Sequence, residues 1–301
     1  MVPTAQEFGR ALNRYWPCWR SALPALKAVV HHLGLNEDDW PLEPVWSCLD
    51  WYAKLVGALP LPKPWSNESR DLKKAILRIY GKRCAIASSD VRRDGTLGRL
   101  LTEEMKPGDV LASLNYDTVA ESVASRFGIQ LDARPRGGAR IAFVKPHGSV
   151  SWTLNLVEHS LIWLSNDGAP LTTPLSEDAI DIGQEPLVLG TVPIKSELIV
   201  EVQSAYAFQS VYQAVLYQWR VLVEAVRDAD LITLVGYRLP PEDLYRRFLL
   251  QEGLRLRSRD MPVHFYELDA SASATEDEIK STFGDRLEQA IHRGPVVEAS
   301  S

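Results

Sequence analysis

From about residue 108 onward, apolar segments of strand length alternate with segments of helical periodicity, and few folds are compatible with this order. The clearest strand is a nearly continuous apolar run at residues 230–240, which suits a sheet covered on both faces. The clearest helix is the long amphipathic segment at residues 207–229. Strands that alternate with helices are typical of a parallel sheet with helices on both sides. The sequence therefore predicts an α/β fold built on a doubly wound parallel sheet.

Residues 1–107 have a different pattern, because they consist mainly of amphipathic helical segments separated by Pro- and Gly-containing breaks. We expect this region to pack on the sheet as a large N-terminal helical insertion. It holds six of the nine tryptophans of the chain. Such a cluster can form a ligand platform, but its helical spacing favours core packing.

Residues 108–290 form the expected sheet core, and residues 291–301 are expected to be a polar tail. Within the core, alternating residues predict a hairpin near residues 150–165. A capped helix is expected at residues 275–291. The chain thus divides into a helical region, a sheet core and a short tail.

Composition excludes several functional classes. The 301-residue chain has a net charge of −6 at pH 7, which disfavours a nucleic-acid-coating role. No run approaches the roughly 18 apolar residues of a membrane span, and the first residues do not resemble a signal peptide. The three cysteines form no Cys-x-x-Cys pair, so neither a zinc site nor a disulfide framework is expected. We expect a cytoplasmic protein that binds no metal and no membrane.

Polar or glycine-containing segments come after four of the expected strands, at the edge where open parallel sheets bind ligands. They are Asn115-Tyr116-Asp117, Pro146-His147-Gly148-Ser149, Gly236-Tyr237-Arg238 and Glu267-Leu268-Asp269. Each alone has a structural explanation: Asp117 can cap a helix, His147 can occupy a turn, and Gly236 can relieve crowding. Their occurrence together predicts a ligand site at one edge of the sheet.

The segments LNYD, KPHGSVSW and LVGYRLPPEDLYRRFLL, in this order, resemble the sirtuin-like NAD-hydrolase domains of prokaryotic antiviral defence systems. The resemblance covers most of residues 1–290 and implies a Rossmann-like sheet that binds NAD. Asn115 and Asp117 match the family's Asn-x-Asp element and His147 matches its His-Gly histidine, so these three are the implied catalytic residues. The implied NAD-binding residues lie beside them or after the later strands: Tyr116, Gly148, Gly236, Tyr237 and Glu267.

Two departures from the family pattern carry expectations of their own. Protein-deacetylating sirtuins have a four-cysteine zinc module after the histidine, whereas this chain continues directly into the expected hairpin, so peptide deacetylation is not expected. The family's Gly-Ala-Gly-x-Ser phosphate loop has no counterpart here, because the first residues of the chain resemble the family segment located immediately after that loop. We therefore expect an in-frame upstream segment that supplies the loop, or else a chain that has lost part of its NAD site.

The resemblance implies hydrolysis of NAD to nicotinamide and ADP-ribose by an antiviral effector. Asn115 would position the ribose or the attacking water, and His147 would accept a proton. Asp117 would orient neighbouring groups or only cap the helix. Two alternatives stay open, namely a nucleotide-binding scaffold subunit without turnover and an ADP-ribosyl transferase. The expected partners are a second copy of the chain or another defence subunit, with nucleic acid reached only through such a partner.

Overall fold

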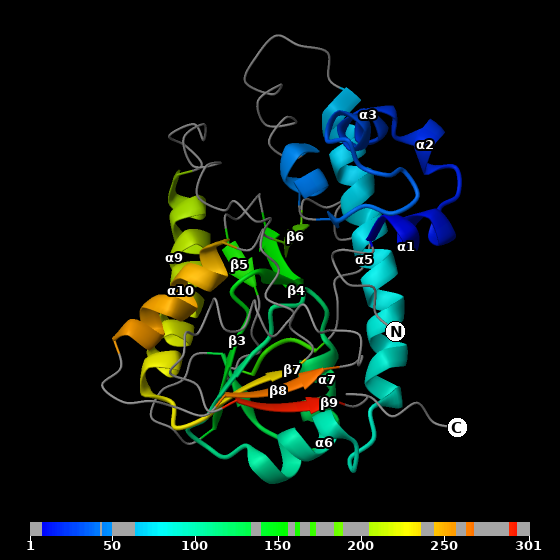
Figure 1. The fold of residues 1–301 in the computed structure, drawn as a ribbon. Coiled ribbons are helices and arrows are strands. Elements are labelled where there is room, and N and C mark those ends of the chain that lie inside the picture. Colours follow the sequence, from blue (N-terminus) through cyan, green and yellow to red (C-terminus); the bar gives the residue numbers. More distant parts are fainter. Residues whose placement is uncertain are drawn as a thin grey trace.

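Helices and short strands are mixed throughout the part of the chain that the structure describes (Figure 1), which confirms that the fold combines helices with strands, as predicted. None of the described helices is long and apolar enough to cross a membrane. The structure is a computed structural model, and it describes residues 8–42, 44–49, 64–133, 140–155, 160–162, 169–172, 184–188, 205–235, 244–256, 263–267 and 289–293.

Most of the described residues in the N-terminal region lie in helices, as the amphipathic pattern predicts. α3 begins with Pro24, whose fixed φ suits the first turn of a helix. α5 is the longest of the described helices; it packs against α1 and α3 and also contacts strand β4 (Gly148–Asn155) (Figure 1). The helices of this region that the structure describes end to end include α1 (Phe8–Tyr15), α2 (Trp19–Ala22), α3 (Pro24–His32) and α5 (Pro64–Asp90).

The core of this helical region is rich in tryptophan. Trp19, Trp40 and Trp46 are buried, and the rings of Trp19 and Trp40 lie 5.8 Å apart in an edge-to-face arrangement. Phe8 of α1 lies 5.5 Å from the Trp40 ring and 6.3 Å from the Tyr80 ring of α5. Aromatic pairs at such separations add to the free energy gained by burial. For these tryptophans the prediction of core packing is confirmed.

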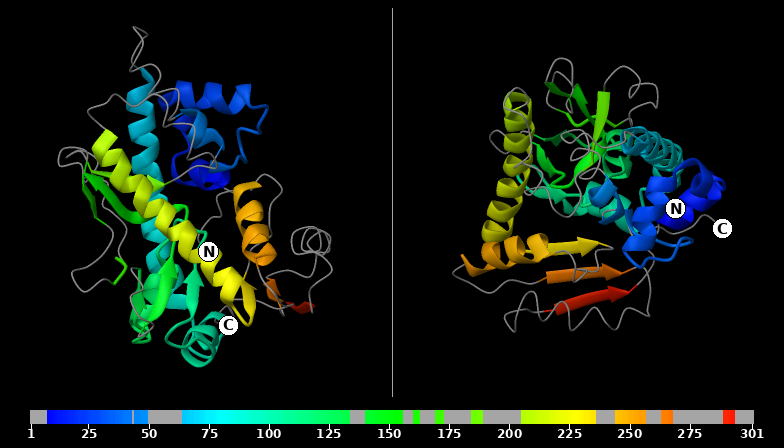
Figure 2. Two further views of the ribbon diagram at one scale, coloured as in Figure 1. Left: turned by 90° about the vertical axis from the view of Figure 1, so that its left-hand side faces the viewer. Right: turned by 90° about the horizontal axis from the view of Figure 1, so that it is seen from above.

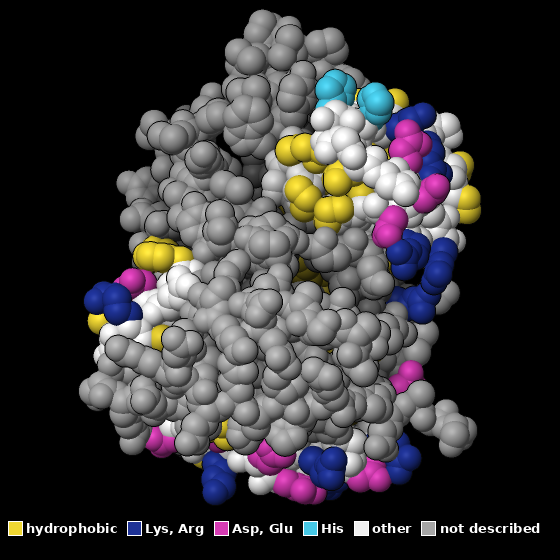
Figure 3. All heavy atoms as spheres, in the orientation of Figure 1, with side chains coloured by type: hydrophobic (Ala, Val, Ile, Leu, Met, Phe, Trp, Pro, Cys, Tyr) yellow, Lys and Arg dark blue, Asp and Glu magenta, His cyan; other side chains and the backbone are white. Residues whose placement is uncertain are grey.

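The outer surface of the helical region mixes charges of both signs (Figure 3). Arg10 pairs with Asp39 at 2.5 Å, and Arg20 pairs with Glu37 at 3.0 Å and with Asp38 at 2.5 Å. Exposed ion pairs contribute about 0–1 kcal/mol each to stability. The stability of the region therefore depends mainly on the tryptophan-rich core.

The first sheet is parallel, with the strand order β1-β3-β2. Its central strand, β3, is buried along its whole length. The helix between β1 and β2 ends before Gly128, whose φ of 75° is adopted readily only by glycine. A short helix (α6, Thr96–Arg99) and a π-helical turn (Leu100–Glu104) precede this sheet. Its elements are β1 (Val110–Ala112), α7 (Val119–Arg126), β2 (Leu131–Asp132) and β3 (Ile141–Val144).

The second sheet is antiparallel, with the strand order β5-β4-β6. Asn155 of β4 pairs with Ser160 of β5, which confirms the predicted hairpin. The register of β4 against β6 shifts between Ser149 and Thr153, as at a β-bulge. The strands are β4 (Gly148–Asn155), β5 (Ser160–Ile162) and β6 (Gln184–Val188).

The third sheet is parallel, with the strand order β7-β8-β9, and its three strands lie side by side in the view from above (Figure 2, right). The helix before β7 (α9) and the helix after it (α10) pack against each other. Gly253 of α10 has no side chain, which allows the two helices to approach closely at Val226 of α9. The elements are α9 (Ala205–Asp228), β7 (Ile232–Val235), α10 (Leu244–Arg255), β8 (Val263–Glu267) and β9 (Gln289–Arg293).

Two sequence-based expectations differ from this arrangement. The parallel strands were expected in one doubly wound sheet, but the described parallel strands fall into two separate sheets of three. The helix expected at residues 275–291 is wrong for its last three residues, which belong to β9. Parallel pairing with β8 sets Ile291 opposite Phe265, and this long-range contact outweighs the local helical pattern.

Two long helices flank the strands that carry the candidate site. α9 contacts β1, β3 and β5, whereas α5 contacts α7 and β4. Figure 1 shows α9 and α5 on opposite sides of these strands, and the view from above in Figure 2 agrees. The segments that leave β1 and β3 are therefore enclosed by helices from both sides.

Candidate functional site

Because β1 and β3 pair in parallel, the two predicted segments that follow them, residues 115–117 and 146–149, leave the sheet at the same edge. Ala112 pairs with Val144 at the end of both strands, and the Ser113 N–H donates to the Val144 carbonyl at 2.9 Å. Asn115 and His147 each lie three residues beyond these strand ends. The Val150 N–H then donates to the Tyr116 carbonyl at 2.9 Å, which ties the start of β4 to the first segment.

His147 is held between two aromatic side chains. Its ring lies 6.4 Å from the Tyr116 ring and 5.4 Å from the Trp219 ring of α9, edge-on to both. Only 7% of His147 is exposed. The sequence predicts this residue at a polar edge of the sheet, but the packing of α9 over the strands buries it. The imidazole is consequently fixed in orientation by contacts that the sequence did not indicate.

The neighbouring residues of the first segment differ in exposure. Asn115 is exposed, whereas Tyr116 and Asp117 are buried. The Asp117 carboxylate accepts the backbone N–H of Val119, the first residue of α7, at 3.0 Å. A carboxylate at a helix N-terminus is favourable both as an acceptor and for the helix dipole. Asp117 therefore makes the structural contact that its position before α7 predicts.

The centre of the site is the fully buried Lys145, which comes directly after β3. Its Nζ donates to Glu121 Oε1 of α7 at 2.9 Å, to Ser149 Oγ of β4 at 3.1 Å and to the carbonyl of Asp117. An ammonium group has three protons, so these three acceptors use its full donor capacity. Ser149 Oγ also donates to the Tyr116 carbonyl at 3.3 Å. Lys145 thereby joins the first segment, α7 and β4 in one network.

Glu121 and Gln218 complete the surroundings of Lys145. Burial raises the pKa of the Glu121 carboxyl, and the Lys145 ammonium opposes this shift by favouring the charged form. Gln218 of α9 accepts the backbone N–H of Lys145 through Oε1 at 2.9 Å. Within the described part of the chain, neither Glu121 Oε2 nor Gln218 Nε2 has a hydrogen-bond partner. The buried Glu121 carboxylate thus depends on Lys145 for its main stabilising contact.

The remaining predicted binding residues do not all belong to this site. Gly148 begins β4 with a φ of 81°, a conformation that favours glycine in the turn after His147. Glu267 is the last residue of β8 and pairs with Arg293, in a different sheet from Asn115 and His147. Gly236 and Tyr237 lie outside the described residues.

Four residues of the site were not predicted from the sequence. Lys145 has a recognisable signal, because it is a charged residue directly between an apolar strand and the His-Gly pair. Gln218 is a polar residue within an apolar stretch of a helix, and Trp219 is its neighbour. Glu121 has no such signal, since an acidic residue in the first turn of an amphipathic helix usually faces solvent.

Among the residues that the structure describes, no three His, Cys, Asp or Glu side chains converge into a metal-binding group. Comparison of the chain with protein-family models, with curated proteins and with solved structures found no match. Function is therefore inferred from the residues themselves and from their geometry.

Proposed function

We propose that this chain is a sirtuin-like NAD hydrolase that cleaves NAD to nicotinamide and ADP-ribose at the edge of the β1-β3-β2 sheet. The observation that carries the proposal is the parallel pairing of β1 with β3. It brings Asn115 and His147 out of one sheet edge, with the Tyr116 ring against the imidazole. Ligands of open parallel sheets bind at this edge. The proposal includes a Rossmann-like arrangement of the complete core.

The chemistry needs a directed water and a proton acceptor. The water oxygen bonds to the anomeric carbon of the ribose, and the bond from that carbon to the pyridinium nitrogen breaks. The bonding electron pair passes to the ring, so nicotinamide leaves as a neutral molecule. One water proton goes to the His147 imidazole and from there to solvent, which leaves ADP-ribose. In this proposal the Asn115 amide orients the ribose or the water.

Neighbouring residues act by holding these groups in place. Tyr116 and Trp219 fix the plane of the imidazole. The Lys145 network holds the backbone of Tyr116 and Asp117 against β4 and α7. Fixed geometry of this kind is what general-base catalysis and water positioning require. The contact of Asp117 with the Val119 N–H favours a positioning role for Asp117 at the start of α7.

The proposal also covers the biological setting that the sequence suggests, a cytoplasmic effector in prokaryotic antiviral defence. A second copy of the chain or another defence subunit is the proposed partner. Both parts rest on the residues shared with the family, above all the LNYD and KPHGSVSW segments.

Product analysis separates the three candidate activities. Purified protein is incubated with NAD, and nicotinamide, ADP-ribose and ADP-ribosylated protein are quantified by mass spectrometry. A hydrolase gives equal amounts of nicotinamide and free ADP-ribose. A transferase gives nicotinamide with ADP-ribose attached to an acceptor, and a scaffold subunit binds NAD without product. Either of the last two outcomes would contradict the proposed hydrolysis.

A further inference from the structure

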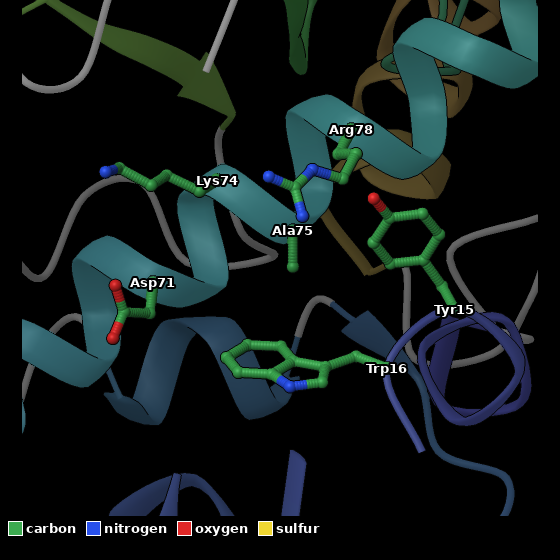
Figure 4. Close-up of a pocket in the computed structure, with 6 residues that line it drawn as sticks. All are labelled: Tyr15, Trp16, Asp71, Lys74, Ala75 and Arg78. Carbon is green, nitrogen blue, oxygen red and sulfur yellow. The ribbon is translucent and has the colours of Figure 1, made fainter. Parts of the chain in front are cut away.

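A second group of aromatic and charged side chains lies between the end of α1 and one face of α5 (Figure 4). The four residues that α5 contributes are three or four positions apart in the sequence, which places them on the same side of the helix. The cavity that they enclose has a volume of about 270 Å³. This α1–α5 pocket is lined by Tyr15, Trp16, Asp71, Lys74, Ala75 and Arg78.

Three of these side chains form a slot. Trp16, Ala75 and Arg78 line the same cavity, and the close-up shows the Arg78 guanidinium and the Trp16 indole on either side of the small Ala75 side chain in this view (Figure 4). Trp16 is half-buried and packs partly on the tryptophan-rich core, which restrains its ring. The Arg78 guanidinium lies 5.6 Å from the centroid of the Tyr15 ring, a cation–π distance. Indole and guanidinium faces both bind planar rings.

The charged side chains around the slot indicate what kind of group a bound planar ring would carry. Lys74 and Arg78 supply two positive groups, and Asp71 supplies one negative group. This local excess of positive charge occurs on a chain whose net charge is −6. It favours an anionic group next to Lys74 and Arg78, because charge-assisted hydrogen bonds are the strong ones. The Asp71 carboxylate can accept hydrogen bonds from an amino group on the ring.

We propose that the α1–α5 pocket binds a purine nucleoside monophosphate. The purine ring lies between Trp16 and Arg78 above Ala75, and the phosphate meets Lys74 and Arg78. The volume of about 270 Å³ lies just below the usual range for drug-sized pockets, roughly 300–1,000 Å³. That size suits a mononucleotide better than a dinucleotide. None of the residues that line this pocket belongs to the candidate NAD site.

Calorimetric titration with three probes tests the ligand class. AMP carries both ring and phosphate, adenosine carries only the ring with its sugar, and ribose 5-phosphate lacks the ring. We expect AMP to bind with a Kd below about 1 mM, the weak end of the usual affinity scale. Adenosine should bind more weakly than AMP, and ribose 5-phosphate should give no measurable heat.

Variants of the pocket test the location. Trp16→Leu removes the stacking face and should weaken AMP binding about 10-fold or more. Ala75→Leu fills the slot and should abolish binding. Lys74→Gln should weaken AMP binding about 10-fold without changing adenosine binding. Lys106→Gln, at an exposed lysine away from the pocket, is the matched control for charge and should leave AMP binding unchanged.

Melting temperatures show whether each variant is folded. Because Ala75 is buried, its replacement can unfold the protein. Lys74 is only partly buried, so Lys74→Gln is expected to fold and its effect on AMP binding can be measured. The inference is overturned if AMP gives no heat at about 1 mM, if adenosine binds as tightly as AMP, or if Trp16→Leu and Lys74→Gln leave AMP binding unchanged. AMP binding that is lost instead in Asn115→Ala would assign the nucleotide to the sheet edge. That result would overturn this inference while leaving the proposed NAD site intact.

Discussion

A fully buried lysine ammonium needs hydrogen-bond acceptors from within the protein. For Lys145 these acceptors come from three different segments. Glu121, Ser149 and the Asp117 carbonyl accept its three protons. Burying two opposite charges together is costly unless the pair is well hydrogen-bonded, whereas leaving one of them alone is costlier still. The single residue Lys145 therefore controls the geometry of the candidate site.

Replacing one member of this ion pair should be worse than replacing both. Lys145→Met leaves the buried Glu121 carboxylate without its partner at 2.9 Å and should lower the free energy of unfolding by about 3–5 kcal/mol. The double variant Lys145→Met/Glu121→Leu should recover most of this loss. Urea unfolding curves measure both values. A surface control, Lys106→Met, should stay within about 0.5 kcal/mol of the original protein; equal stability of all four proteins would refute the role of the pair.

The buried Cys84 thiol lies next to Thr118, just before α7, and allows the packing there to be tested by the pH dependence of stability. Its Sγ accepts the Thr118 N–H at 3.4 Å, and burial raises the pKa of its thiol from 9.0 to about 11. Between these two pH values the folded protein keeps a proton that the unfolded chain has lost. The stability of the original protein relative to Cys84→Ala should therefore be greatest below pH 9 and decrease as the pH rises toward 11, by up to about 1.4 kcal/mol per pH unit.

Urea unfolding of the original protein and of Cys84→Ala, at several pH values from neutral to alkaline, measures this difference. Other groups that titrate in both proteins cancel in the comparison. A difference in stability that stays constant across the alkaline range would show that the thiol ionises equally in the folded and unfolded states.

At the scale of the elements, the local hydrophobic pattern and the turn residues were sufficient to predict most of the described helices and strands. The helix expected at residues 207–229 overlaps α9 (Ala205–Asp228) over nearly its whole length, and the strand expected at residues 230–240 contains β7 (Ile232–Val235). β9 was missed because its sequence, QAIHR, has only one β-branched residue. Its strand conformation depends on pairing with β8, a contact that no short window of sequence contains.

The docking of α1 gives a test at this scale. A Cβ at Gly9 would lie 2.5 Å from both the backbone nitrogen and the ring of Trp40, so the chain there must move to accept it. Gly9→Ala should therefore lower the free energy of unfolding by about 1–3 kcal/mol, although alanine is the better helix former. Thermal unfolding measures the change. Gly95→Ala is the control, because its Cβ would meet no atom closer than 3.4 Å; similar melting temperatures for both variants would contradict the close packing of α1.

At the scale of the whole molecule, the sequence predicted a mixture of helices and parallel strands but not how the sheets are divided. Parallel strands at residues 110–112 and 232–235 look alike in sequence, yet they lie in different sheets. The partners of a strand are chosen by contacts between distant segments, such as α9 against both β1 and β5. The same long-range packing explains why Trp219 and Gln218 were not predicted next to His147 and Lys145.

Metal removal tests the molecule as a whole. The spacing of cysteine and histidine in the sequence matches no metal site, and the described residues contain no cluster of three metal-binding side chains. We expect excess EDTA to leave the melting temperature and any NAD cleavage unchanged. Elemental analysis of the purified protein provides the independent check, and zinc at one ion per chain would contradict the expectation.

The rate of nicotinamide release by matched site variants tests the central proposal most directly. The original protein is compared with Asn115→Ala and His147→Asn, with Lys106→Gln as the control. Asparagine is chosen at position 147 because the side chain there is buried between two rings. We predict that each site variant folds but loses activity on the order of 100-fold or more, while the control keeps its rate. NAD cleavage at the original rate in both folded site variants would contradict the proposed site.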